Sequence, residues 1–216
     1  LLHYLQTVDT TNRYTVLLKP SDISGWSPTN PNFTKQATPY KEFTFSEQLG
    51  FRGQIKSLRA DLVHFPFAHQ PIWYSGAVVT TIQDLTTLRF NNPDKNGLVF
   101  GFKQHVYSHV VKRVSRKSSR LITPSEFVKN DIAEYAAVDS DKITVTYEAA
   151  EPINESAKAI AGLQDGKFIM YVGRPTPHKN LERLISAFQS LRAQHPDLHL
   201  VLAGKKDANY LEIEQQ

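Results

Sequence analysis

The chain has 216 residues, of which 40% are hydrophobic and none is cysteine. This length and composition fit a soluble globular protein with one large domain or two small ones, and the absence of cysteine excludes disulfides, thiol nucleophiles and cysteine zinc sites. The net charge of +4 favours phosphate-bearing or anionic-membrane partners over nucleic acid. No apolar run approaches the roughly 20 residues of a membrane span, and no signal peptide is visible, so a cytoplasmic location is expected.

Strand and helix patterns alternate through the first 150 residues. Residues 1–5 are interpreted as the last turns of a helix that leads into a strand at residues 14–18. Residues 21–39 carry three prolines among Ser, Thr and Asn, which predicts a long loop. Short apolar, β-branched runs at residues 62–65 and 77–82 predict strands buried on both faces. Two further strands are expected at residues 120–123 and 142–147.

A basic amphipathic helix is predicted over residues 98–120. Its apolar positions follow helical spacing and are Val99, Phe102, Val106, Val110 and Val114. The cations among them are Lys103, Lys112, Arg113, Arg116 and Lys117. Two interpretations remain open for this helix: it docks on anionic lipid, or its charged side is an ordinary solvated face.

Ser125 is a typical N-cap for a helix predicted over residues 126–137. Strands alternating with helices indicate a parallel sheet with helices on both faces, and therefore a Rossmann-like domain over residues 1–150. Residues 151–166 contain Pro and Gly among small residues and are interpreted as a linker. A second αβ unit is expected over residues 167–216, with strands at 168–172 and 198–204 and helices starting near Leu181 and Asn209.

The most informative segment is residues 172–180, Val-Gly-Arg-Pro-Thr-Pro-His-Lys-Asn, between a strand and the helix start near Leu181. Backbone N–H groups and the positive end of the helix dipole face such a loop and favour an anion. Arg174 and Lys179 add two charges, which predicts a diphosphate site. The alternative is a βα loop whose basic residues only face water.

With these motifs the chain resembles the retaining glycosyltransferases of family 4 (glycosyl transferases group 1). The segments that carry the resemblance are residues 60–66, 79–85, 122–127, 142–145, 171–185 and 200–204. The resemblance implies the GT-B fold, an α/β architecture of two Rossmann-like domains with parallel sheets. It also implies transfer of a sugar from a nucleotide-diphosphate donor to an acceptor hydroxyl with retention, in the synthesis of a cell-envelope polysaccharide or glycolipid.

The resemblance also assigns roles to individual residues. Arg174 and Lys179 would stabilise the charge that builds on the departing diphosphate, and Gly173 would let the backbone approach the donor phosphates. Asp84 would be catalytic at the end of the strand over residues 77–82. Gln83 stands where the family commonly has His, so it would bind the donor sugar without carrying a proton.

Weaker expectations concern the acceptor or sugar side of the site. His64 and Ser125 are the candidates, and His69 has less support. Each has a plainer interpretation: a partly buried histidine for His64, a helix cap for Ser125, and an N-cap or loop carboxylate for Asp84. No metal site and no cofactor are predicted, because the basic residues of this family neutralise the donor.

The resemblance further implies that both domains are incomplete here. The first strand and a glycine-rich loop would precede Leu1, and a Glu pair would follow Gln216, so this fragment is expected to be inactive alone. The expected partners are a nucleotide-sugar donor, a glycan or lipid-linked acceptor and an anionic membrane surface on the inner face of the membrane. Two other functions remain open: a module that binds a nucleotide sugar without turnover, and a nucleotide-sugar epimerase.

Overall fold

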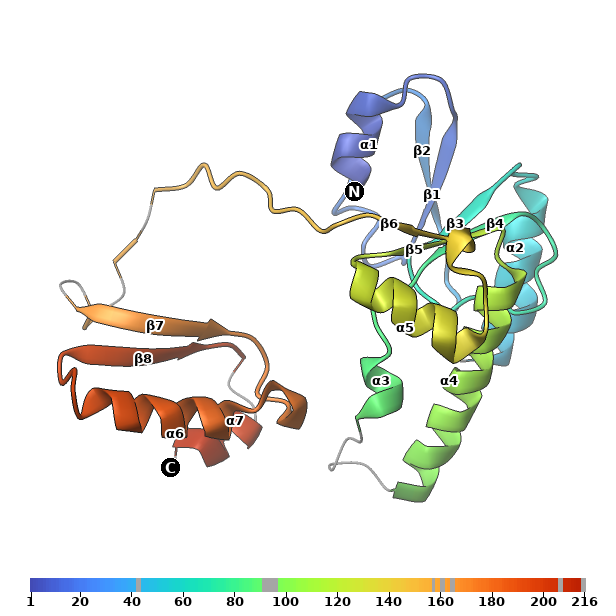
Figure 1. Ribbon diagram of the computed structural model, residues 1–216. Helices are drawn as coiled ribbons and strands as arrows, with labels where there is room; N and C mark the ends of the chain where they lie inside the picture. Colours follow the sequence, from blue (N-terminus) through green and yellow to red (C-terminus); the bar gives the residue numbers. More distant parts are fainter. Residues whose placement is uncertain are drawn as a thin grey trace. The chain divides into compact units, whose positions relative to one another are not determined.

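The computed structural model describes residues 1–41, 44–90, 97–156, 158–159, 162–163, 166–205 and 208–214. The chain divides into two compact units, Leu1–Ala149 and Ala150–Gln216, each with helices and parallel strands (Figure 1). The predicted α/β class with parallel sheets is therefore confirmed.

The main sheet of the first unit has four parallel strands in the order β3-β4-β5-β6. These strands span Val63–Phe65, Val78–Thr81, Arg120–Thr123 and Ile143–Val145. The sequence located all four, with wider bounds for three of them. Because every strand runs in the same direction, their carboxyl ends meet at one edge of the sheet, which is where open α/β sheets bind ligands.

The two faces of this sheet are buried unequally. Paired positions in the register, such as Phe65 with Thr80 and Leu121 with Ile143, are buried on one face. On the other face His64 and Thr144 are exposed. The expectation of burial on both faces is thus wrong for the strand predicted over residues 62–65, in which His64 is exposed. Apolar runs of three or four residues are too short to distinguish alternating from two-sided burial.

The larger core lies between the sheet and the helices that follow β4 and β5. These helices are α3 (Thr86–Arg89), α4 (Gly97–Lys117) and α5 (Glu126–Ala136). The buried residues of this core, from the sheet, the loops and the helices, are Ala68, Ile82, Leu85, Val111, Leu121, Val128, Ile132 and Ile143. The Ser125 hydroxyl caps α5, accepting a hydrogen bond from the Val128 N–H at 3.2 Å, as predicted. A 3-10 turn, η2 (Ser140–Lys142), leads into β6.

Helix α4 differs from the sequence prediction in the face that it buries. Phe102 is 70% exposed and Val106 is 44% exposed, although both were assigned to the apolar face. The buried positions are Val111, Val114 and Ser115, in the second half of the helix. The first half of α4 extends past α5 (Figure 1), so its apolar residues have less to pack against there.

A helical segment that the sequence analysis missed precedes β3. It consists of a π-helical turn, η1 (Glu47–Phe51), followed by α2 (Arg52–Ser57). Its Ile55 is buried in a second core cluster with Phe65, Tyr74 and Val78. This cluster fixes the loop between β3 and β4 against the sheet.

The predicted long loop over residues 21–39 is wrong in its second half. Strand β2 (Phe33–Ala37) pairs in parallel with β1 (Tyr14–Leu18), forming a separate two-stranded sheet next to α1 (Leu2–Val8). The Phe33 ring is 2% exposed and stacks on the Tyr14 ring at 4.4 Å. The three prolines lie outside the strand, so none of them interrupts its pairing.

The second unit pairs β7 (Lys167–Val172) in parallel with β8 (Leu198–Ala203). A 3-10 turn, η3 (Pro177–Lys179), and helix α6 (Leu181–Arg192) connect the two strands. Helix α7 (Ala208–Glu214) follows β8. The predicted strands and helix starts of this unit are present.

The capping bond at Ser125 generates a stability prediction. Ser125→Ala removes the hydroxyl that accepts from Val128 and is expected to lower the free energy of unfolding by about 1 kcal/mol. Ser125→Asp keeps a capping oxygen and is the matched control. Urea unfolding of the three proteins measures the effect, and equal stability of all three would show that the cap contributes nothing.

Candidate functional site

The loop of residues 173–180 begins where β7 ends and is fixed there by a close glycine contact. Gly173 has φ +154°, and its N–H donates to the Ala203 carbonyl at 2.9 Å. A Cβ at Gly173 would lie 2.8 Å from the Tyr171 hydroxyl, and a Cβ at Gly204 would overlap the Gly173 carbonyl oxygen. Gly204 is therefore required for the ends of β7 and β8 to approach this closely, and Gly173 leaves room for the Tyr171 side chain of its own strand.

Two tyrosine hydroxyls fix the first carbonyl groups of this loop. The Tyr210 hydroxyl, from α7, donates to the Gly173 carbonyl oxygen at 2.9 Å. The Tyr171 hydroxyl donates to the Arg174 carbonyl oxygen at 3.0 Å. Pro175 is buried. The backbone that carries Arg174 is thus held from two sides.

The last residues of the loop lead directly into the amino terminus of α6. Residues 177–179 form the 3-10 turn η3, and Asn180 adopts the left-handed conformation with φ 54° before the helix starts at Leu181. The first N–H groups of a helix have no intrahelical partner. In this 12-residue helix they face the loop, together with the positive end of the dipole.

Arg174 and Lys179 are both exposed. Within the described part of the chain, neither side chain forms a hydrogen bond or an ion pair. Two cations without protein partners, on a fixed loop at a helix amino terminus, form an arrangement suited to an anion. Gly173 lies in the same loop, so the structure brings these three predicted residues together.

Gln83 and Asp84 follow the carboxyl end of β4, and both are exposed. One Asp84 carboxylate oxygen accepts a hydrogen bond from the Thr86 N–H at 2.7 Å. The next residue, Leu85, is buried and anchors the segment. Asp84 therefore serves as a loop carboxylate that shapes the start of α3, which was the plainer of its two interpretations. This bond occupies one of its two oxygens.

One aromatic residue near Asp84, Tyr107, was not assigned to the site by the sequence analysis. The pKa of the Tyr107 phenol is raised by burial, then by the Asp84 charge and by Tyr135. The Tyr107 ring stacks on the His69 ring at 4.9 Å. His69 was a weak candidate, and Tyr107 was hidden within the pattern of α4.

His64 lies on β3, and Ser125 is the N-cap of α5, just after β5 ends; β3 and β5 flank β4. The His64 Nε2 and the Thr81 hydroxyl are 2.8 Å apart in a hydrogen bond across the β3–β4 pair. His64 is exposed, which differs from the expected partly buried histidine, yet desolvation by the surrounding chain still lowers its pKa. Ser125 uses its hydroxyl to cap α5.

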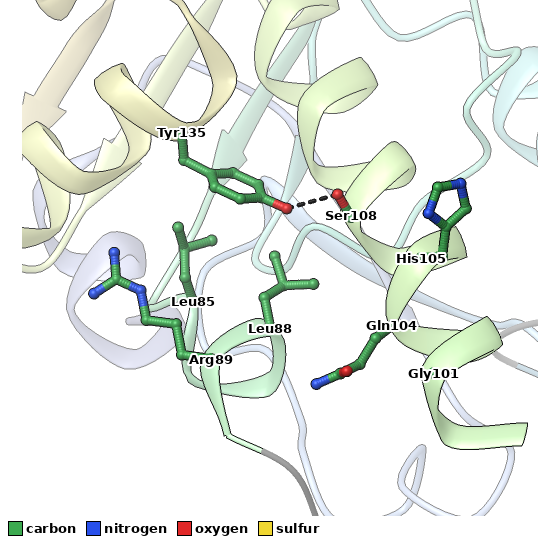
Figure 2. Close-up of a pocket in the computed structure, with 8 residues that line it drawn as sticks. All are labelled: Leu85, Leu88, Arg89, Gly101, Gln104, His105, Ser108 and Tyr135. Carbon is green, nitrogen blue, oxygen red and sulfur yellow. Dashed lines mark hydrogen bonds between the residues drawn. The ribbon is translucent and has the colours of Figure 1, made fainter. Parts of the chain in front are cut away.

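A cavity of about 330 Å³ opens next to the Asp84 segment, between α3, α4 and α5 (Figure 2). Its lining residues are Leu85, Leu88, Arg89, Gly101, Gln104, His105, Ser108 and Tyr135. The Tyr135 hydroxyl donates to the Ser108 hydroxyl at 2.6 Å, and Arg89 pairs with Asp131. This mixed polar and apolar cavity contains none of the predicted first-unit site residues in its lining.

The described residues form neither a cluster of metal-ligating side chains nor a helix that could span a membrane. No group of three or more His, Asp or Glu side chains is placed to hold a metal ion there. None of the helices in those ranges is long and apolar enough to cross a membrane.

Comparison with known proteins identifies relatives. The family described as Glycosyltransferase Family 4 matches residues 21–152, and the family described as Glycosyl transferases group 1 matches residues 153–216. The uncharacterized glycosyltransferase YqgM of Bacillus subtilis is 34% identical over 102 residues, which are 47% of this chain and 27% of the relative. The O-antigen chain mannosyltransferase RfbU of Salmonella typhimurium is 28% identical over 173 residues, 80% of this chain and 44% of the relative.

One solved structure, a glycosyltransferase from Rickettsia africae ESF-5, aligns with a TM-score of 0.43 and 14% identity. The alignment covers 93% of this chain and 71% of that chain. The chain spans less than half of the length of the two curated relatives described above. Two α/β units with parallel sheets are consistent with a GT-B type fold. Because the first family matches residues 21–152, well over half of the sequence, the chain belongs to the family 4 glycosyltransferases.

Proposed function

We propose that the protein transfers a sugar from a nucleotide-diphosphate donor to a hydroxyl of a glycan or lipid-linked acceptor, with retention of configuration. The observation that carries this proposal is the loop of residues 173–180, which presents, before the amino terminus of α6, two cations that bind no other described residue. When the bond from sugar to diphosphate breaks, negative charge grows on the leaving oxygen. Cations already in place stabilise that charge more than they stabilise the bound donor.

The two cations differ in how they can bind the phosphate oxygens. The Arg174 guanidinium offers a planar fork that matches two phosphate oxygens, and the Lys179 ammonium acts as a mobile point charge. Gly173 keeps the approach to the phosphates free of a side chain. Because tyrosine hydroxyls hold the Gly173 and Arg174 carbonyl groups, the loop needs little reorganisation when the donor binds.

On the first unit we assign hydrogen-bonding roles rather than proton transfer. Gln83 and the remaining oxygen of Asp84 are exposed at the carboxyl end of β4, where they can bind sugar hydroxyls. His64, with its lowered pKa, is neutral at neutral pH and also acts as a hydrogen-bonding group. The hydroxyl of Ser125 is occupied by its cap, so we assign Ser125 a supporting role.

The biological context follows from the relative with the longest alignment described above. RfbU carries the name of an O-antigen chain mannosyltransferase, which supports a role in cell-envelope polysaccharide synthesis. We propose the same broad context here, with the protein at the cytoplasmic side of the membrane, where a lipid-linked acceptor is available. No metal or other cofactor is part of this proposal, since the two cations neutralise the diphosphate.

A second function, binding of a nucleotide sugar without turnover, is favoured by one observation. Asp84 uses a carboxylate oxygen to bind the Thr86 N–H, and its neighbour Gln83 carries no titratable proton. A transfer assay on the full-length protein with UDP-, GDP- and dTDP-sugars and a lipid-linked acceptor separates the two functions. Donor binding without product in every combination would favour the binding module.

Arg174→Ala and Lys179→Ala test the diphosphate site in the full-length protein. Each should cost on the order of 2 to 4 kcal/mol in the transition state, or two to three decades in kcat/KM. Both side chains are exposed, so the melting temperature should hardly change. Arg192→Ala, an exposed arginine at the other end of α6, is the matched control. Wild-type turnover in both loop variants would refute the assignment.

Gly173→Ala tests the close contact beneath the phosphate loop. The new Cβ meets the Tyr171 hydroxyl at φ +154°, so we expect a loss of about 1 to 3 kcal/mol in the stability of the second unit. Donor affinity should fall with it. Gly53→Ala is the control, because Gly53 is helical and has open space around its Cβ position. Thermal unfolding that shows no difference between the variants would contradict the strain.

We also propose that the outward side of α4 contacts an anionic membrane surface. Phe102 and Val106 are exposed one turn apart, and the exposed Lys103 lies beside them. Two other cations of α4 are occupied: Lys112 lies over the Tyr135 ring, and Arg116 donates to the Ala136 carbonyl at 3.0 Å. The contact therefore rests on an apolar pair with one cation more than on a polybasic face.

Flotation with vesicles of phosphatidylglycerol and phosphatidylcholine tests this contact. Phe102→Ser combined with Lys103→Gln should lower binding at least fivefold, because each lost group contributes about 1 kcal/mol or more. Phe127→Ser on α5 removes an equally exposed aromatic ring elsewhere and should leave binding unchanged. Equal binding to anionic and neutral vesicles, or no effect of the double substitution, would exclude this surface.

A further inference from the structure

A second cavity lies at the edge of the main sheet opposite to Asp84. We call it the 71–76 pocket. It has a volume of about 310 Å³ and is lined by Ile72, Trp73, Tyr74, Ser75, Gly76, Arg113 and Lys117. Residues 72–76 precede β4, and the two cations come from the last two turns of α4, which leads to β5. The pocket therefore lies at the amino ends of these strands, whereas Gln83 and Asp84 follow a carboxyl end.

The wall of this pocket is held in place without a ligand. The Lys117 ammonium donates to the Pro71 carbonyl at 3.1 Å. The Gln48 side chain donates to the Gln70 carbonyl at 3.3 Å and accepts from the Ile72 N–H at 2.9 Å. Tyr74 is buried in the second core cluster. These contacts indicate a preformed site, which binds with a smaller loss of conformational entropy than a mobile loop.

The lining is rich in hydrogen-bond donors and has no carboxylate. Over the described residues, the Arg113 guanidinium and the N–H groups of Ser75 and Gly76 have no hydrogen-bonding partner. Lys117 sits beside Arg113, and its pKa is lowered to about 8 by burial and by the Arg113 charge. A bound anion would relieve this repulsion between the two cations.

The pocket is larger than a phosphate ion and has an aromatic wall. Trp73 is 49% exposed and is one of its lining residues, and its ring offers a flat apolar surface with one N–H donor. A volume of about 310 Å³ is at the lower end of the range for small-molecule sites. It therefore has room for a phosphate together with a ring of monosaccharide size.

We propose that the 71–76 pocket binds a phosphorylated ligand of monosaccharide size, with the phosphate between Arg113 and Lys117 and the ring against Trp73. The site shares no residue with the donor loop, because its lining belongs to the first unit and residues 173–180 belong to the second. The same phosphate chemistry occurs in a soluble sugar phosphate and in a lipid headgroup. Binding there places a second phosphate-recognising site on the chain in addition to residues 173–180.

Isothermal titration calorimetry with glucose 6-phosphate tests the proposal, with glucose as the neutral probe. One or two charge-assisted bonds predict a dissociation constant on the order of 1 mM, and glucose should not bind detectably. Arg113→Gln, an exposed position, should weaken binding about tenfold or more. Lys56→Gln on α2 removes an exposed cation outside the pocket and should leave binding unchanged.

The dependence on pH gives a second readout. Glucose 6-phosphate is already dianionic above about pH 7. Any change in its affinity at higher pH therefore reports a change in the charge of the protein. Lys117 is charged below its pKa of about 8, and its affinity for an anion should fall as pH rises from 7.5 to 9.5. The groups facing its ammonium are Arg113 and the Tyr74 phenol, which lies 5.9 Å away by its ring centroid. In Lys117→Met this pH dependence should disappear.

Vesicles containing phosphatidic acid distinguish the two sources of phosphate. If they bind in a manner that Arg113→Gln abolishes and glucose 6-phosphate does not compete, the ligand is a lipid headgroup. Competition by glucose 6-phosphate indicates the soluble ligand, and either result supports the site. The proposal is overturned if neither probe binds the wild-type protein, or if Arg113→Gln and Lys56→Gln bind as the wild type does.

Discussion

Parallel pairing of the strands is the constraint on which every site in this chain depends. In β3 to β6, and again in β7 with β8, neighbouring strands run in the same direction. A chain that pairs strands in this way must return to the starting edge after each strand. Within each sheet the carboxyl ends therefore gather at one edge: Gln83 and Asp84 emerge there in the first unit, and the loop of residues 173–180 emerges there in the second. The connections return to the opposite edge, where the 71–76 pocket forms from a loop and the end of α4.

In the second unit, a few contacts at the end of β7 fix the backbone of the loop that follows this strand. Gly204 lets the backbones of the two strand ends approach, and Tyr210 adds a hydrogen bond from α7 to the Gly173 carbonyl. The Tyr171 hydroxyl binds the Arg174 carbonyl. The side chains of Arg174 and Lys179 are exposed on this fixed backbone, before the amino terminus of α6. The contacts of the backbone thus explain how an exposed loop can have a defined geometry suited to an anion.

The sequence predicted best what depends on neighbours along the chain. The strand, loop and helix around Arg174 are local, and so is the cap formed by Ser125, so both were recognisable from their residue order. Strand β2 was missed because the prolines around it suggested a loop, although its pairing depends on the distant Tyr14. The exposure of Phe102 was missed because helical spacing shows which residues share a face, but not where the partner of that face ends. The 71–76 pocket joins residues about 40 positions apart, so periodicity could not reveal it.

The contacts of the basic residues show why net charge is a poor guide to function in this protein. Arg116 donates to the Ala136 carbonyl, and Lys142 donates to the Arg116 carbonyl. These cations connect neighbouring elements of the fold, and the backbone carbonyl groups that they bind partly compensate their charge. Arg174, Lys179 and Arg113 have no such bonds in the described chain and remain available to an external anion. Substituting Arg116 or Lys142 should therefore lower mainly the stability of the fold. Substituting Arg174, Lys179 or Arg113 should lower mainly the affinity for an anion.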